Sequence, residues 1–350
     1  MMLLLVAALV YLPLAGQLGY YKDDWHVAWS GTARGAGSII DLHLNDRPGM
    51  GVVYAGLFAL LGNAPFNWQL YAFFIRVVGG ALFLWILWLI NRDFKRENLL
   101  AALLFVVYPG FLQQPNASSY QCHLTGLAFG LLSIALSLQV LFTSSKVWRW
   151  VLAVLSALFA VACYFMMEYM IGLEGLRLVL LAYVLYPRLN SVKKALFKTL
   201  RYWLPDLIGL IAFLSWRLLF FKSARSVTDV GLLSKSYLTD PLGMLLRFAF
   251  ETFKGYLNAL LGAWMVPFYQ VSNRAAYTDL AVSLGLVMVV LFVLWYYWKH
   301  VPLQDQGKRH SAPLMLIGAG LLGALLPLLP IILSYRQVEF QDTFDRYTLP

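Results

Sequence analysis

Long apolar segments alternate with short polar connections along almost the whole chain. An α-helix needs about 20 apolar residues to cross a bilayer core of roughly 30 Å, and this length marks the segments that we predict to be membrane spans. The nine predicted spans cover residues 1–20, 68–90, 98–112, 120–142, 150–168, 170–186, 202–221, 279–298 and 312–333. The pattern predicts an all-α, polytopic transmembrane bundle that forms a single domain over residues 1–350.

The composition agrees with a membrane protein. Hydrophobic residues make up 61% of the chain and charged residues only 13%, whereas a soluble domain carries about 25% charged residues. The net charge of +10 does not indicate a nucleic-acid partner, because the basic residues gather in short connections between apolar segments. We therefore expect membrane lipids as partners. The four basic connections are residues 91–98, 143–150, 187–201 and 299–310.

The positive-inside rule gives these connections a side. All four lie in the cytoplasm if the run 49–61, which has 13 residues, is an interfacial or re-entrant helix and not a span. The loop 20–67 then lies outside. The amphipathic run 242–267 is expected to lie along the surface, and if it crossed the membrane the later connections would change sides.

The external loop 20–67 contains the strongest candidate for chemistry. Asp23 and Asp24 stand where the first predicted span ends. Neighbouring carboxylates can hold unequal pKa values, because like charges resist joint ionisation. One of them can then accept a proton from an incoming hydroxyl as a general base. The alternative, with about equal weight, is a solvated helix end or half of a salt bridge.

Several short motifs follow in a fixed order: Asp23-Asp24-Trp25, Asp46-Arg47-Pro48, Leu61-Gly62, the embedded Arg76, and the terminal Arg346-Tyr347-Thr348-Leu349-Pro350. This order resembles the GT-C glycosyltransferases, whose relatives include protein O-mannosyltransferases and lipid A aminoarabinose transferases. The motifs cover residues 1–92 and the end of the chain, and the middle is similar in topology only. Asp-Asp stands where some relatives have Asp-Glu, and no large soluble C-terminal domain follows, so the subfamily and the sugar stay open.

The resemblance implies an inverting transfer of a sugar from a polyprenyl-phosphate carrier to a glycan, lipid or protein acceptor. It places the general base on Asp24, with Asp23 as the second choice. It implies that Arg47 and Arg346 bind the phosphate, since guanidinium groups offer it two donors. Asp46, Glu168 and Tyr347 are further candidates for the same cavity. The site is expected to face outward from a prokaryotic cytoplasmic membrane.

Other ionisable residues have simpler interpretations. Glu168 follows a predicted span, and a helix-end carboxylate is favoured over a site residue. Glu174 and Arg177 are three residues apart and share a helix face, which predicts a structural pair. Asp206 and Arg217 are also embedded and can pair or face a polar cavity.

No metal or other cofactor is expected. The histidines His26, His43 and His123 lack the spacing of metal ligands, although some GT-C members use a divalent cation. The two cysteines, Cys122 and Cys163, support neither a disulfide framework nor a thiolate site.

Two other functions stay open. A transporter or flippase of a lipid-linked sugar would place ionisable residues near the midplane of the membrane. A polysaccharide polymerase or ligase would use a lipid-diphosphate donor. Because no span follows the terminal segment, we also expect that a C-terminal part of the protein is missing.

Overall fold

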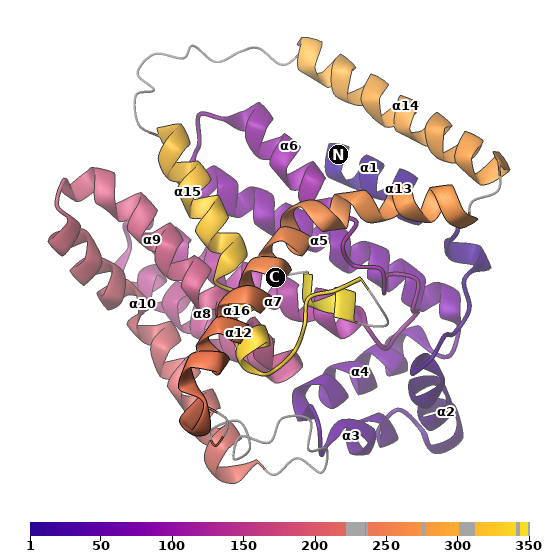
Figure 1. Cartoon of the computed structure of the whole chain (residues 1–350), viewed down its shortest axis with the longest axis horizontal. Coiled ribbons are helices and arrows are strands. Elements are labelled where there is room, and N and C mark those ends of the chain that lie inside the picture. The colour runs from indigo at the N-terminus through magenta and orange to yellow at the C-terminus, as the bar shows by residue number, and fades with distance from the viewer. Residues whose placement is uncertain (222–234, 236, 275–276, 301–311, 341–343, 349–350) are drawn as a thin grey trace.

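The computed structural model describes residues 1–221, 235, 237–274, 277–300, 312–340 and 344–348. Within these ranges every regular element is a helix, which confirms the predicted all-α class (Figure 1). Seven described helices are long and apolar enough to cross a membrane, as in an integral membrane protein. They cover Pro65–Ile90, Gln121–Val140, Lys146–Met166, Glu168–Leu189, Val192–Phe220, Leu280–Lys299 and Leu316–Leu333.

The prediction of nine spans is not confirmed, because two of the predicted spans form shorter helices. α1 (Met2–Tyr11) has 10 residues and α6 (Lys95–Val106) has 12. Proline follows the end of each helix, at Pro13 and Pro109. Proline has no backbone N–H to donate and disfavours helical geometry in the residue before it, so neither helix continues to the predicted length.

The runs 49–61 and 242–267, neither of which was predicted to span the membrane, form helices shorter than the seven. α4 (Pro48–Leu61) has 14 residues, starts on a proline and ends at Gly62, whose φ of +70° is readily adopted only by glycine. Residues 242–267 fall in α12 (Pro241–Leu257), a π-helical turn (Asn258–Gly262) and α13 (Ala263–Arg274). Neither run is among the seven apolar helices of spanning length.

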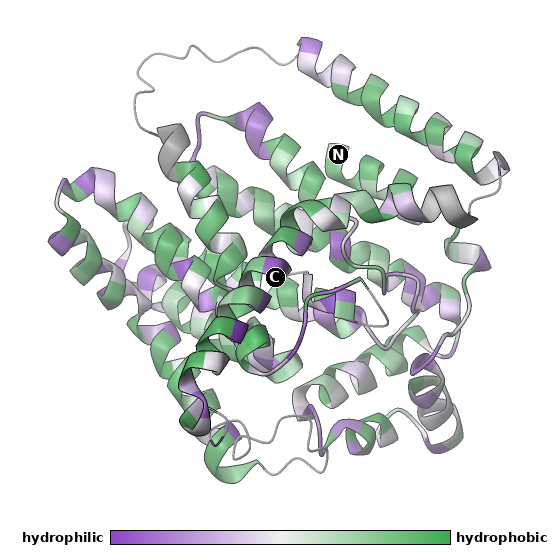
Figure 2. Ribbon diagram, viewed as in Figure 1, coloured by the Kyte–Doolittle hydropathy of each residue, from purple (hydrophilic) through white to green (hydrophobic). Residues whose placement is uncertain are grey.

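The bundle is built around α7 (Gln121–Val140), most of whose residues are buried. It packs against α5 (Pro65–Ile90), α8 (Lys146–Met166) and α9 (Leu173–Leu189). Gly130 permits the close approach, since a Cβ there would lie 2.5 Å from Leu173 Cδ1. Figure 2 shows mostly hydrophobic residues along α14 (Tyr277–His300), with the hydrophilic residues of the long helices mostly near their ends.

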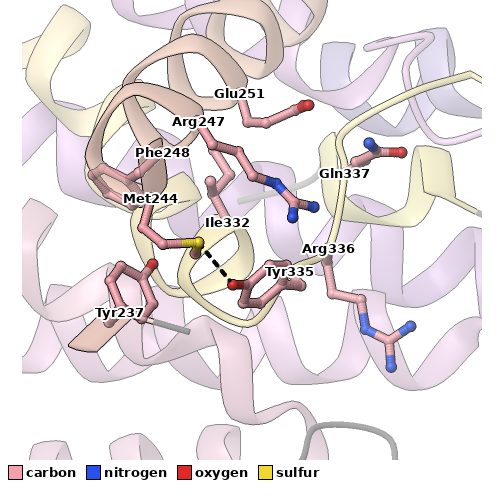
Figure 3. A pocket seen from close by; sticks show the side chains of 9 residues that line it. All are labelled: Tyr237, Met244, Arg247, Phe248, Glu251, Ile332, Tyr335, Arg336 and Gln337. Carbon is pink, nitrogen blue, oxygen red and sulfur yellow. Dashed lines mark hydrogen bonds between the residues drawn. The ribbon is translucent and has the colours of Figure 1, made fainter. Parts of the chain in front are cut away.

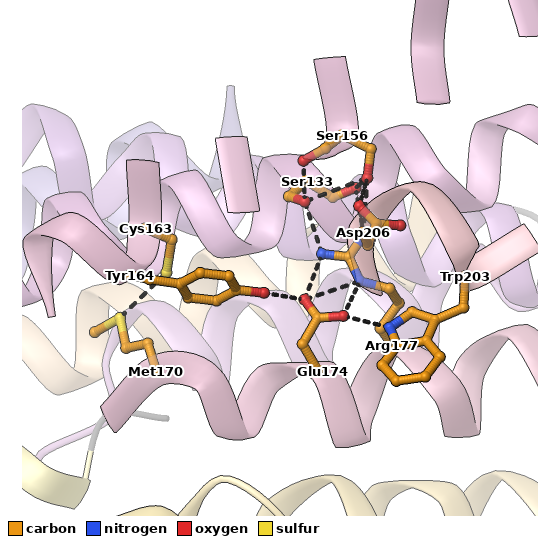
Figure 4. A network of polar contacts seen from close by, with 9 residues as sticks. All are labelled: Ser133, Ser156, Cys163, Tyr164, Met170, Glu174, Arg177, Trp203 and Asp206. Carbon is orange, nitrogen blue, oxygen red and sulfur yellow. Dashed lines mark hydrogen bonds and ion pairs between the residues drawn. The ribbon is translucent and has the colours of Figure 1, made fainter. Parts of the chain in front are cut away.

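A buried polar network joins the core helices (Figure 4). Arg177 of α9 pairs with Glu174 at 2.9 Å and with Asp206 of α10 (Val192–Ser215) at 3.0 Å. Tyr164 and Trp203 donate to Glu174, each at 2.6 Å. The predicted structural pair of Glu174 and Arg177 is therefore confirmed. Asp206 joins this network, so it does not pair with Arg217.

Candidate functional site

The segment 107–120 between α6 and α7, which we call the hub loop, connects the parts of the chain that carry the predicted site residues. It contains the polar run Gln113-Gln114-Pro115-Asn116-Ala117-Ser118-Ser119. Several of these side chains are buried, including Gln113, Asn116 and Ser118. Buried polar groups must be hydrogen-bonded, so this loop needs specific partners from the rest of the fold.

Asp24 is the first of these partners. It starts α2 (Asp24–Arg34) and its side chain is fully buried. Its Oδ2 accepts hydrogen bonds from the backbone N–H of Tyr21, at 3.0 Å, and of Ala117, at 2.7 Å. Its Oδ1 accepts from the backbone N–H of Ser118, at 2.9 Å, and of Ser119, at 2.6 Å, and from both serine hydroxyls. Both carboxylate oxygens are thus fully engaged in fixing the hub loop to the segment between α1 and α2.

The neighbouring Asp23 has the opposite surroundings. Its side chain is 70% exposed, and its ion-pair partner is His26, with Nδ1 4.0 Å from Asp23 Oδ1. Trp25 and Trp29 on the same helix are also exposed, as expected of aromatic residues at a membrane interface. Of the two predicted acids, Asp23 is therefore the one whose oxygens are accessible to a second molecule.

α4 and α5 brace the hub loop from another side. The Tyr54 hydroxyl is buried, donates to the carbonyl of Ser118 and accepts from the backbone N–H of Cys122 at 2.7 Å. Gln69 donates to the carbonyl of Pro115 at 2.6 Å. Burial raises the pKa of Tyr54 well above its ordinary value, so this hydroxyl keeps its proton and its role as a donor.

The C-terminal helical turn (Phe344–Thr348) docks on the same loop. Asp345 is buried and accepts from the backbone N–H of Leu112, at 2.7 Å, and from the Gln113 amide, at 2.6 Å. Burial raises the pKa of its carboxyl above the ordinary value, while these hydrogen bonds act in the opposite direction. Asp345 was not among the residues predicted from the sequence, although it stands directly before the Arg346-Tyr347 pair.

Arg346 and Arg47 converge on one region from opposite ends of the chain. The positive charges of both act electrostatically on Cys122, His123 and Tyr169. Arg346 stacks over the rings of Tyr120, at 5.8 Å, and Tyr347, at 4.9 Å.

Arg346 and Arg47 each have a further polar partner. Arg346 receives a further anchor, because its Nη2 donates to the Tyr347 hydroxyl at 3.0 Å. Arg47 lies beside Asp46, with 3.7 Å between Nη1 and the carboxylate, and its side chain is 34% exposed. Tyr347 is buried and packs edge-on against Tyr169 at 5.2 Å. The structure thus pairs Arg47 with Asp46 and Arg346 with Tyr347.

His123 and Tyr169 form a polar contact next to Arg346. His123 Nδ1 and the Tyr169 hydroxyl are 2.6 Å apart, and Tyr169 also reaches the backbone carbonyl of Arg346 at 3.4 Å. His123 is buried between the rings of Phe111 and Tyr120. Among the described residues, no group of three His, Cys, Asp or Glu side chains could hold a metal ion. The two cysteines are free thiols.

Glu168 is engaged elsewhere. It opens the 3-10 turn before α9 and forms a 2.6 Å ion pair with Arg217. Arg217 in turn stacks on Phe221 at 4.6 Å. This pair occupies the carboxylate and agrees with the structural interpretation that the sequence favoured for Glu168.

Arg76 is buried in α5 and also contacts the hub loop. It donates to Gln114 at 2.8 Å and lies over the rings of Tyr11 and Phe111 at 5.3 and 5.7 Å. Its Nε has no hydrogen-bond partner, and in the described part of the chain no carboxylate lies within ion-pair distance of Arg76. A buried arginine without a carboxylate is a costly arrangement, which its contacts with Gln114 and the two rings offset in part.

A small pocket lies between α12 and the segment after α16 (Leu328–Leu333), as Figure 3 shows. Arg247 stacks on the Tyr335 ring at 4.3 Å, and the Tyr335 hydroxyl contacts Met244 Sδ at 3.1 Å. Its interior volume of about 10 Å³ leaves room for about one water molecule. None of the predicted site residues lines it, so we assign it a packing role.

Comparisons with protein-family models, curated proteins and solved structures found no match for this chain. The function must therefore be argued from the site itself.

Proposed function

We propose that the protein is a membrane glycosyltransferase that moves a sugar from a polyprenyl-phosphate carrier to an acceptor hydroxyl at the external face of the membrane. The observation that carries the proposal is the placement of Arg346 over the Tyr120 ring at the end of the hub loop, held by Tyr347 and next to Tyr169, with the charge of Arg47 acting on the same neighbouring groups. Arg47 and Arg346 are 299 positions apart in the sequence. Together they form a cationic region at the end of apolar helices. An ionised phosphate on a lipid matches both features.

The arginines would stabilise the departing phosphate. Transfer from a lipid-phosphate sugar breaks the bond between the anomeric carbon and a phosphate oxygen, so negative charge grows on the leaving group. Fixed guanidinium groups stabilise such charge, and they do so more strongly in a site that excludes water. Arg346 is held by Tyr120 and Tyr347 before any ligand binds, and this costs the reaction little reorganisation.

The surroundings of the two aspartates support a division of roles. Asp24 has six donors on its two oxygens, and a substrate hydroxyl would have to displace one of them. We therefore assign Asp24 to positioning the hub loop and propose Asp23, whose carboxylate is exposed, as the general base. In an inverting transfer, Asp23 takes the proton of the acceptor hydroxyl as that oxygen attacks the anomeric carbon from the face opposite the phosphate.

The embedded ionisable residues give little support to a transporter. Glu174, Arg177 and Asp206 are paired with one another and buried. A transport path would instead expose such groups to a water-filled cavity. We therefore treat this network as structural.

Binding of polyprenyl phosphate tests the proposal without knowledge of the sugar, because this carrier is common to all such donors. We expect Arg47→Gln and Arg346→Gln each to weaken its binding at least tenfold, measured by native mass spectrometry of the full chain. Arg149→Gln, at an exposed position of α8, is the matched control. The neutral polyprenol should bind weakly and equally to all variants. Unchanged phosphate binding in the double variant Arg47→Gln/Arg346→Gln would overturn the assignment.

A further inference from the structure

A large apolar cavity lies between α1, α5, α6 and α14. Its volume is about 980 Å³, at the upper end of the roughly 300–1,000 Å³ typical of ligand pockets. Leu84, Trp85, Trp88 and Leu89 of α5 form one wall, and Val293, Tyr296 and Tyr297 of α14 form the opposite one. No residue of the hub loop lines it, so the cavity is separate from the candidate site.

α14 leaves this space because it packs loosely on the rest of the bundle. None of the residues in the apolar stretch of α14 is buried. Its contact with α1 includes Val290 and Leu294, which pack against the cluster around Leu3 and Val6. Trp88 and Tyr296 stay 48% and 55% exposed. The walls are therefore apolar and open on the side, as expected where a hydrocarbon chain fills the gap between two helices.

Cations stand at one end of the cavity. Arg92 and Lys95 belong to its lining and are exposed. Arg92 stacks on the Phe142 ring at 4.7 Å, and Arg188 stacks on the same ring at 4.6 Å. None of these three cations forms an ion pair within the described residues, although Asp93 and Glu97 are close in sequence. Three cations gathered without a carboxylate attract an anion from outside the chain.

We propose that this cavity binds an anionic membrane phospholipid. One acyl chain lies between α5 and α14, and the phosphodiester headgroup contacts Arg92 and Lys95. Guanidinium and ammonium groups bind phosphate through charge-assisted hydrogen bonds, and basic pockets between membrane helices are typical sites for anionic headgroups. The site lies at the end of the bundle that carries the basic connections, away from the loop with Asp23.

Tryptophan fluorescence tests the occupant directly, because Trp85 and Trp88 line the cavity. The full chain is reconstituted in nanodiscs with phosphatidylglycerol or phosphatidylcholine that carries brominated acyl chains, and bromine quenches nearby tryptophans. The quenching of Trp88 is obtained by subtracting the fluorescence of Trp88→Phe from that of the wild type. This subtraction removes the contribution of the other tryptophans. We expect the Trp88 component to be quenched more strongly by phosphatidylglycerol than by phosphatidylcholine.

Arg92→Gln/Lys95→Gln should lose this preference. Each cation near the membrane surface contributes about a fivefold preference, so the pair contributes about thirtyfold. Lys193→Gln/Lys194→Gln is the matched control, since it removes two exposed cations from the start of α10 and should keep the preference. Equal quenching by the two lipids, or an equal loss in the control, would overturn the proposal. Displacement of brominated phosphatidylglycerol by polyprenyl phosphate at equal concentration would also overturn it, since the cavity would then belong to the carrier.

Discussion

Substitution of Asp24 by asparagine isolates the role of the buried carboxylate. The change keeps the size of the side chain but turns one acceptor oxygen into an NH2 group that only donates. If the amide nitrogen replaces Oδ2, the backbone N–H groups of Tyr21 and Ala117 lose their acceptor. If it replaces Oδ1, the N–H groups of Ser118 and Ser119 lose theirs, although the two hydroxyls can rotate. Either orientation leaves two donors without an acceptor, one of a buried and one of a partly buried hydrogen bond.

The magnitude follows from this count. A buried donor left without a partner costs about 1–3 kcal/mol, and the partly buried donor adds a smaller cost. Native domains are stable by only about 5–15 kcal/mol. We therefore expect Asp24→Asn to lower the melting temperature of the detergent-purified protein by many degrees. Asp23→Asn is the matched control, because its side chain is exposed and surface substitutions usually change stability by less than about 0.5 kcal/mol.

The two variants also separate structure from catalysis. Asp23→Asn should melt with the wild type but lose sugar transfer, whereas Asp24→Asn should lose stability and activity together. Melting of Asp24→Asn at the wild-type temperature would refute the account of the hub loop. Transfer at the wild-type rate by Asp23→Asn would remove Asp23 as the base, and loss of transfer by a fully stable Asp24→Asn would return that role to Asp24.

Three further predictions concern other parts of the molecule. Arg177→Leu should destabilise the protein by about 3–5 kcal/mol in chemical unfolding, because Glu174 and Asp206 would stay buried without their cation; Arg149→Leu, at an exposed position, is the control, and equal unfolding of the two would contradict the network. Arg346→Lys keeps the charge but loses the planar stacking on Tyr120 and Tyr347, so KM for the lipid-phosphate donor should rise roughly tenfold with a smaller change in kcat; an unchanged KM would argue against donor binding there. Asp345 has a raised pKa, so its contribution to stability is present at pH values below its ordinary 3.8 and is lost as the pH rises through the folded value; melting curves of Asp345→Asn between pH 3 and 7 should lack this component, and an identical pH profile would contradict it.

The apolar periodicity of the chain predicted the helical class and most of the long helices, because lipid and core both select apolar residues over continuous stretches. It overestimated α1 and α6, where the residues are apolar but Pro13 and Pro109 end the helix. Hydropathy indicates whether a segment is stable in an apolar environment. It does not indicate over how many residues the hydrogen bonds of the helix continue. Both prolines are present in the sequence, and their positions predict where the two helices end.

The candidate site shows a different limit. Arg47, Arg346 and Tyr347 became candidates only through the resemblance to the GT-C glycosyltransferases and their place outside the predicted spans. The hub loop was not, although Gln113-Gln114-Pro115-Asn116 interrupts two apolar runs. Its conformation depends on partners at residues 24, 54, 69, 76 and 345, and no local pattern encodes contacts over such separations. A short polar run between apolar helices needs partners for every buried group, and that requirement is what draws Asp24, Arg76 and Asp345 to one loop.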